Sequence, residues 1–192
     1  MALAKQAKIL SGRQVAHLLS FLSLTRHPDR NRVIVLLSVK AGLRAKEIAN
    51  LKWDMVTDAE GALSTAIRLE DAATKGSSGR VIPLGRDLTE ALSELHLTRT
   101  ENSFVITSER SPQLSAAAVV NLFADWYRRL GFRGCSSHSG RRTFITNAAR
   151  KIGAVGGSLR DVQMLAGHSA LSTTQRYIES DAEAQRKVVD LV

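Results

Sequence analysis

Residues 138–177 carry His138, Arg141, His168 and Tyr177 in a strongly basic part of the chain. The window from 126 to 160 contains no Asp or Glu, and its cations are Arg128, Arg129, Arg133, Arg141, Arg142, Arg150, Lys151 and Arg160. A solvated helix face normally mixes both signs of charge, so a window of one sign favours an anionic partner. Double-stranded DNA is the best candidate, because Lys and Arg on its phosphates supply much of a protein's affinity. The alternative is a basic surface that only aids solubility.

The chain as a whole is basic, with 27 Lys and Arg against 18 Asp and Glu, a net charge of +9 and a pI of about 10.3. Its 192 residues, 44% of them hydrophobic, suffice for one domain or two small ones with a substantial core. The single cysteine, Cys135, allows no disulfide within the chain. The apolar run at 33–37 is too short to span a bilayer, and the first residues lack the apolar segment of a signal peptide. We therefore expect a soluble, cytoplasmic protein that makes no membrane contact.

We expect a helix to begin near His138 and to position both His138 and Arg141. Ser136 and Ser137 are candidate N-caps, and an apolar helical face follows from Phe144 onward. His138 and Arg141, three residues apart, then share one face of the first turn. The unpaired N–H groups of a helix start suit a phosphate, and a guanidinium grips two phosphate oxygens at once. A capped helix with a solvated arginine is the alternative.

Apolar periodicity predicts the rest of the fold. We expect helices at residues 11–24, 29–41, 43–51, 87–97, 115–130 and 161–166, and one beginning at 172–174 that carries Tyr177. Between residues 53 and 84 the period shortens, which predicts strands at 53–56, 66–69 and 80–84 with a glycine-rich turn at 76–79. The predicted fold class is α+β, mainly α with a small three-stranded antiparallel β-sheet.

Three motifs of the basic stretch, HSGRR, LAGHS and STTQRY, resemble those of the tyrosine recombinase (phage integrase) family. The resemblance rests on a His-x-x-Arg box, a Gly-His element and a tyrosine nine positions after that histidine. Arg44, in the GLRAKE context, matches the arginine of the family's first box. Lys75, in TKGSSGR, fits the family's lysine on a β-hairpin between the boxes. All elements occur in order, and the resemblance extends over roughly residues 10 to 180.

The resemblance implies site-specific DNA recombination or integration. Tyr177 is expected to attack the scissile phosphate, form a 3′-phosphotyrosyl link and free a 5′-hydroxyl. Arg44 and Arg141 would neutralise the pentacovalent transition state, and His168 would donate a further hydrogen bond. Lys75 is the expected general acid, and His138 the expected proton acceptor for a phenol that is mostly protonated at neutral pH. One phosphoester is exchanged for another, so neither ATP nor a metal nor another cofactor is expected.

Other residues are assigned supporting roles. Glu47 lies one turn from Arg44 and is expected to hold it by a charged hydrogen bond, the alternative being a surface ion pair of little energetic value. DNA phosphate contacts are expected from four further arginines, namely Arg80, Arg128, Arg129 and Arg142. Arg142 also departs from the family, which more often has a histidine at that position.

The family resemblance also bears on domain organisation. About forty residues precede Arg44, and their two helices belong to the catalytic fold, so we expect residues 1–180 to form a catalytic domain without a separate N-terminal core-binding domain. Residues 181–192 form a tail with an apolar end, which either packs on its own domain or docks on a neighbouring protomer, as in a tetramer on DNA. A partner recombinase or another DNA-binding protein would then supply the missing DNA contacts.

Three alternative functions remain open at the level of sequence. One is topoisomerase-like nicking and religation without synapsis, and another is a non-catalytic DNA-binding accessory protein. A metal nuclease using Cys135, His138 and His168 is the third, although the basic window offers no carboxylates and no recognised ligand spacing.

Overall fold

The computed structural model describes residues 7–71, 79–98, 102–109, 111–177 and 188–190. Its elements in chain order are α1 (Gly12–Leu22), α2 (Pro28–Ala41), α3 (Ala45–Asn50), η1 (Trp53–Met55), β1 (Ala66–Leu69), β2 (Arg80–Pro83), α4 (Arg86–Leu97), α5 (Ala116–Arg129), α6 (Ser139–Lys151), η3 (Ile152–Val155), α7 (Leu159–Ala166) and α8 (Leu171–Gln175). Among the described residues, no helix combines the length and apolar character needed to cross a bilayer.

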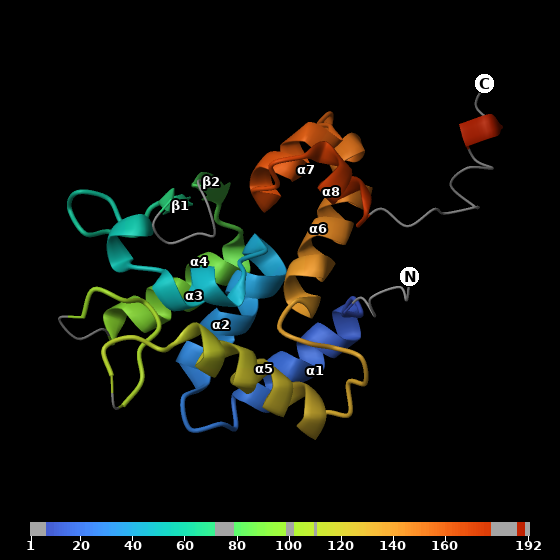
Figure 1. The fold of residues 1–192 in the computed structure, drawn as a ribbon. Coiled ribbons are helices and arrows are strands. Elements are labelled where there is room, and N and C mark those ends of the chain that lie inside the picture. The colour runs from blue at the N-terminus through green and yellow to red at the C-terminus, as the bar shows by residue number, and fades with distance from the viewer. Residues whose placement is uncertain (1–6, 72–78, 99–101, 110, 178–187, 191–192) are drawn as a thin grey trace.

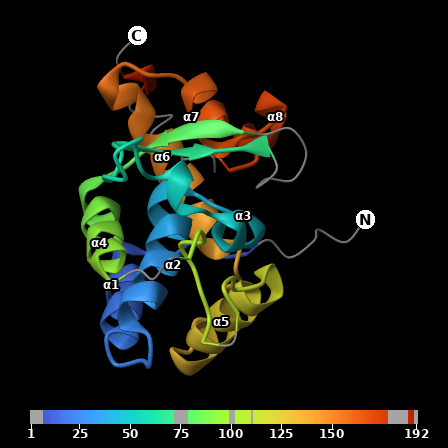
Figure 2. The same cartoon turned by 90° about the vertical axis from the view of Figure 1, so that its left-hand side faces the viewer.

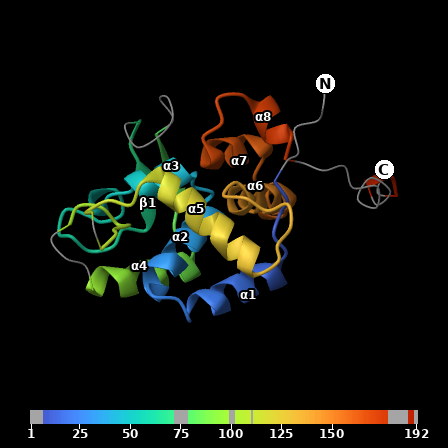
Figure 3. The ribbon, with the colours of Figure 1, turned by 60° about the horizontal axis from the view of Figure 1, so that its bottom comes forward.

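Helix α2 is the centre of the fold. It begins with Pro28 in its first turn and ends at Gly42, and it is buried on nearly all sides rather than along one stripe. Helices α1, α3, α4 and α6 pack around it (Figure 1). Helix α5 crosses over α3 on the other side of the molecule from the sheet (Figure 3). The main core therefore surrounds α2 and includes its Val33, Ile34 and Leu37.

Within the described ranges the sheet has two antiparallel strands, with Ile67 opposite Ile82, and it lies between α3 and α7 (Figure 2). The predicted third strand at 53–56 is wrong. Trp53 and Met55 are buried and Asp54 is exposed, which imitates a strand pattern, but the Val56 N–H donates to the Trp53 carbonyl and closes a 3₁₀ turn. The α+β class is confirmed, with a smaller sheet than expected.

A second, small core lies at the far end of α6. Ile145 of α6 packs there with Val162 and Ala166 of α7, and Tyr177 packs against this cluster from outside. In Figure 1, α6 leads from the main body to α7 and α8 at the top of the view. The segment that carries His168 and Tyr177 is thus held by its own core and by its link through α6.

Helices α2 and α6 approach each other closely at Gly140. A Cβ atom there would lie 2.9 Å from Ser38 Cβ and 3.0 Å from Val39 Cγ1, both on α2. We expect Gly140→Ala to destabilise the fold by about 1 to 3 kcal/mol, because these atoms belong to the packed centre. The matched control is Gly153→Ala, where a new Cβ meets nothing within 4 Å. Urea unfolding compares the two, and equal stabilities would contradict the packing described.

Candidate active site

One pocket of about 550 Å³ gathers most of the residues that the sequence predicts to be catalytic. Its lining includes Arg44, His138, Arg141, His168 and Tyr177. They come from four separate places, the start of α3, the start of α6, the turn after α7 and the end of α8. Lys75, the predicted general acid, lies outside the described residues.

Arg141 is the most deeply buried of the pocket's cations, with 3% of the residue exposed. Its Nη1 donates to the Gly42 carbonyl and its Nη2 to the Ala166 carbonyl, each at 2.6 Å. Burial, followed by the nearby charge of Arg44, lowers the pKa of Arg141 to about 10, so the side chain stays cationic at neutral pH. Its two bonds tie the turn after α2 to the end of α7 and leave further N–H donors for an anion in the pocket.

Glu47 is a buried carboxylate shared by two arginines. Its Oε1 accepts from Arg44 Nη1 at 2.7 Å, and its Oε2 accepts from the Arg44 backbone N–H at 2.8 Å. Arg80 adds two bonds, Nη1 to Oε1 at 3.1 Å and Nη2 to Oε2 at 3.0 Å. Burial would raise the pKa of Glu47, but the bonds from Arg80 and Arg44 outweigh it and hold the pKa below its ordinary value. The Glu47 side chain is 1% exposed, so its contact with Arg44 is not a surface ion pair.

Arg80 is predicted to contact a DNA phosphate, but its side chain is buried. Its side chain is 6% exposed, and its Nε donates to the Leu165 carbonyl at 2.9 Å while the rest of the guanidinium holds Glu47. Little of it remains accessible to a DNA phosphate. The strand pattern contains the signal for this burial, because Arg80 and the buried Ile82 lie two apart and therefore share a face of β2.

His168 follows the glycine that ends α7. Gly167 has a φ of +61°, and a Cβ on it would lie 2.9 Å from the Arg80 side chain, so both the turn and the space favour glycine. Gln163 holds the backbone of His168 in place, because its Nε2 donates to the His168 carbonyl at 2.8 Å. Burial, followed by the positive charges of Arg141, Arg44 and Arg80, lowers the pKa of His168 to about 4. The imidazole is therefore neutral at pH 7.

Tyr177 lies two residues beyond the last residue of α8, not within a helix as predicted. Its ring stacks on the His168 ring with centroids 5.4 Å apart and an angle of 21° between the planes. Thr146 of α6 donates from Oγ1 to the Tyr177 carbonyl at 3.2 Å. The phenol is thus oriented by the second core, by the imidazole and by α6, while its residue remains part of the pocket lining.

His138 is the N-cap residue of α6, so the prediction that Ser136 or Ser137 caps this helix is wrong by one or two positions. The serine hydroxyl at 136 instead accepts from the His138 backbone N–H at 3.3 Å. His138 is exposed and lines the pocket together with Arg141 in the first turn of α6. The predicted shared face at the helix start is therefore present.

The remaining predicted DNA contacts fall in two places. Arg142 lines the same pocket and donates from Nη1 to the Ala7 carbonyl at 3.0 Å. Arg128 and Arg129 are exposed at the end of α5, where both pair with Asp125. Helix α5 lies at the opposite end of the molecule from α7 and α8 (Figures 1 and 2), so the structure does not bring these two arginines to the pocket.

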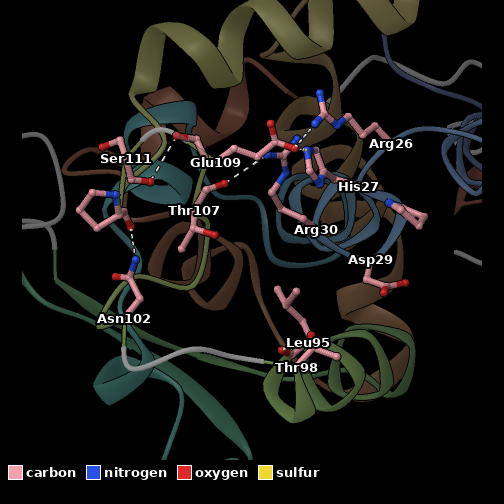
Figure 4. A pocket seen from close by; sticks show the side chains of 13 residues that line it. Arg26, His27, Asp29, Arg30, Leu95, Thr98, Asn102, Thr107, Glu109 and Ser111 are labelled. Atoms are coloured by element: carbon pink, nitrogen blue, oxygen red, sulfur yellow. Dashed lines mark hydrogen bonds and ion pairs between the residues drawn. The ribbon is translucent and has the colours of Figure 1, made fainter.

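A second and larger pocket, of about 760 Å³, lies between the start of α2, the end of α4 and the loop around Glu109 (Figure 4). Three of its basic side chains already have partners within the pocket. Arg26 Nη2 lies 2.8 Å and His27 Nε2 3.1 Å from Glu109 Oε1, and Arg30 Nη1 donates to the Thr107 carbonyl. None of the predicted catalytic residues that the structure describes lines it, so size alone does not identify the site.

The lowered pKa of His168 predicts a stability loss in mild acid. An unfolded histidine binds a proton near pH 6.5 and His168 in the folded chain only near pH 4, so the unfolded state gains protons first as the pH falls. We expect the unfolding free energy to drop by about 1 to 2 kcal/mol between pH 6.5 and 5 on this account. Urea unfolding of wild type and His168→Gln tests this, because the variant should show a shallower decline. Parallel declines would contradict a buried neutral imidazole.

Comparison with known proteins places the chain in a family. The model of the phage integrase family matches residues 8–184. The chain is 33% identical over 184 residues to "Tyrosine recombinase XerA" of Thermococcus kodakarensis, which covers 94% of this chain and 61% of the relative. It is 29% identical over 188 residues to "Tyrosine recombinase XerC" of Haemophilus influenzae, covering 95% and 60%. This chain therefore spans about three fifths of the length of these relatives.

Solved structures agree on the fold. The crystal structure of XerA recombinase matches with a TM-score of 0.71 at 22% identity, covering 98% of this chain and 66% of that one. The Tn1549 transposon integrase in complex with transposon right end DNA matches with a TM-score of 0.75 at 16% identity, covering 97% and 66%. The fold is that of a tyrosine recombinase catalytic domain. The chain belongs to the phage integrase family, which confirms the resemblance seen in its motifs.

Proposed function

We propose that this chain cuts and rejoins double-stranded DNA in site-specific recombination, through a covalent 3′-phosphotyrosyl intermediate. The single observation that carries the proposal is the meeting of Arg44, Arg141, His168 and Tyr177 in one pocket. Two guanidiniums beside a phenol form a site that binds a phosphodiester and presents a nucleophile to it. Relatives named as tyrosine recombinases support the same reaction.

The residues divide the chemistry among them. Tyr177 Oη forms a bond to phosphorus as the bond from phosphorus to the 5′ oxygen breaks, and the phenol proton passes to His138. Arg44 and Arg141 stabilise the negative charge on the non-bridging oxygens, and neutral His168 donates a hydrogen bond. The leaving 5′ oxygen takes its proton from Lys75. Attack by a 5′-hydroxyl of another strand reverses the reaction and exchanges the strands.

Other parts of the proposal concern assembly. Residues up to 180 act as the catalytic domain, and the tail from 181 to 192 docks on a neighbouring protomer of a DNA-bound tetramer. Val188 and Val189 in this tail are exposed, 59% and 69% respectively, which leaves them accessible to such a partner.

Covalent trapping tests the function even though the target sequence is not defined. The probe is a library of duplex oligonucleotides with a randomised centre and a nick, in which the cleaved strand loses a short fragment and cannot be rejoined. We expect an adduct that survives SDS and forms in the presence of EDTA. Absence of any adduct would contradict the proposal, and an adduct that EDTA abolishes would favour a metal nuclease. Captured sequences, placed on one or two sites of a supercoiled plasmid, then separate recombination from relaxation alone.

A further inference from the structure

Thr174 contacts His168 and Tyr177, the two proposed catalytic residues that come last in the sequence. Its backbone carbonyl accepts from the Tyr177 N–H at 3.0 Å. Its Oγ1 lies 3.0 Å from His168 Nδ1, and the residue is fully buried. One threonine thus closes the ten residues from His168 to Tyr177 into a compact turn.

The direction of the hydrogen bond between Thr174 and His168 follows from the surroundings of the hydroxyl. Among the described residues, Nδ1 of His168 is the only hydrogen-bond partner of Thr174 Oγ1. A buried hydroxyl whose proton has no acceptor is costly, so the proton is expected to point at Nδ1. Nδ1 can accept it only as an unprotonated nitrogen, which a neutral imidazole provides. The ring proton then resides on Nε2.

We propose that Thr174 is a positioning residue that fixes the Nε2–H tautomer of His168 and so makes the ring a hydrogen-bond donor toward a phosphate in the pocket. This inference rests on the proposed function for its catalytic consequence, but the tautomer itself does not depend on it. Without the hydroxyl, the neutral ring can carry its proton on Nδ1. Nε2 then presents a lone pair to the pocket in place of an N–H group. A lone pair repels the negative oxygens of the transition state where a donor would stabilise them.

The matched pair of variants is Thr174→Val and Thr174→Ser. Valine keeps the shape and removes the hydroxyl, whereas serine keeps the hydroxyl and removes only a methyl group. We expect Thr174→Val to slow adduct formation by roughly ten- to a hundred-fold, by analogy with the loss of a group that orients a metal-bound histidine. Thr174→Ser should recover most of the rate. A Thr174→Val variant that reacts at the wild-type rate would overturn the proposal.

Nitrogen-15 NMR of the histidine side chains reads the tautomer directly. The His168 signals are assigned by their loss in His168→Gln. In the wild type Nδ1 should be unprotonated and Nε2 protonated, and Thr174→Val should shift the mixture toward Nδ1–H. Thr146→Val is the control, because it removes another buried hydroxyl that bonds the Tyr177 carbonyl and not the imidazole, and it should leave the tautomer unchanged.

The two readouts separate this inference from the proposed function. A wild-type protein with protonated Nδ1 refutes the inference even if Thr174→Val fails to fold. A wild-type protein that forms no adduct on any probe refutes the proposed function, while the tautomer remains measurable.

Discussion

A Tyr177→Phe variant should form no covalent adduct with the nicked duplexes, a loss of roughly 10⁴-fold or more. Phenylalanine retains the ring that stacks on His168 and packs on the second core, and it loses only the oxygen that would attack phosphorus. Folding should therefore be unchanged, which far-UV circular dichroism and thermal unfolding can check. The measurement is the SDS-resistant band on a denaturing gel after incubation with labelled probe.

The chain contains a matched control for this variant. It has two tyrosines, and the other one, Tyr127, is 2% exposed in the main core. Its hydroxyl has no hydrogen-bond partner among the described residues, and burial raises its pKa. Tyr127→Phe should leave both stability and adduct formation near wild type, because removing an unsatisfied buried hydroxyl costs little. Adduct formation that survives in Tyr177→Phe would reject Tyr177 as the nucleophile.

Glu47→Gln is expected to have the largest effect on stability, a loss of about 3 to 5 kcal/mol. The carboxylate holds Arg44 and the buried Arg80 together, and a neutral amide leaves Arg80 without its counter-charge and turns an NH₂ group toward donors. Arg44 would lose its fixed position as well, so adduct formation should fall even at temperatures where the variant is folded. Urea unfolding and the trapping assay measure the two effects.

Glu94→Gln serves as the control for charge removal. Glu94 pairs with Arg32 on the surface, with the two side chains 55% and 35% exposed. An exposed pair contributes at most about 1 kcal/mol, because water and salt screen it. If Glu47→Gln costs no more than Glu94→Gln, the buried network does not hold the site together.

Much of the fold is predictable from local pattern. The helices around α2 follow from apolar spacing, and the predicted cap of α6 differs from His138 by only one or two residues, because two serines directly precede that histidine. The false strand at Trp53 has a different cause. Alternating burial over three residues is produced equally by a strand and by a 3₁₀ turn, and only tertiary contacts decide between them.

For the site, the sequence predicts which residues take part but not how they are arranged in space. Motif spacing names Arg44, Arg141, His168 and Tyr177, but no spacing shows that they share a pocket, since that depends on how α6 and α7 pack. Arg80 is predicted to contact DNA because a basic residue beside a glycine-rich turn is usually solvated, whereas the structure buries its side chain against Glu47. Its burial depends on Glu47, 33 positions away in the sequence. Alternation along β2 places Arg80 on the buried face, but periodicity cannot identify Glu47 as its partner.

The residue that becomes attached to DNA can be identified directly, and its identity decides whether the proposed chemistry is correct. The trapped complex is digested with protease and nuclease, and the modified peptide is sequenced by mass spectrometry. We expect a nucleotide joined through its 3′ phosphate to Tyr177, with a free 5′-hydroxyl on the other side of the break. Attachment to any other residue, or through a 5′ phosphate, would contradict this chemistry.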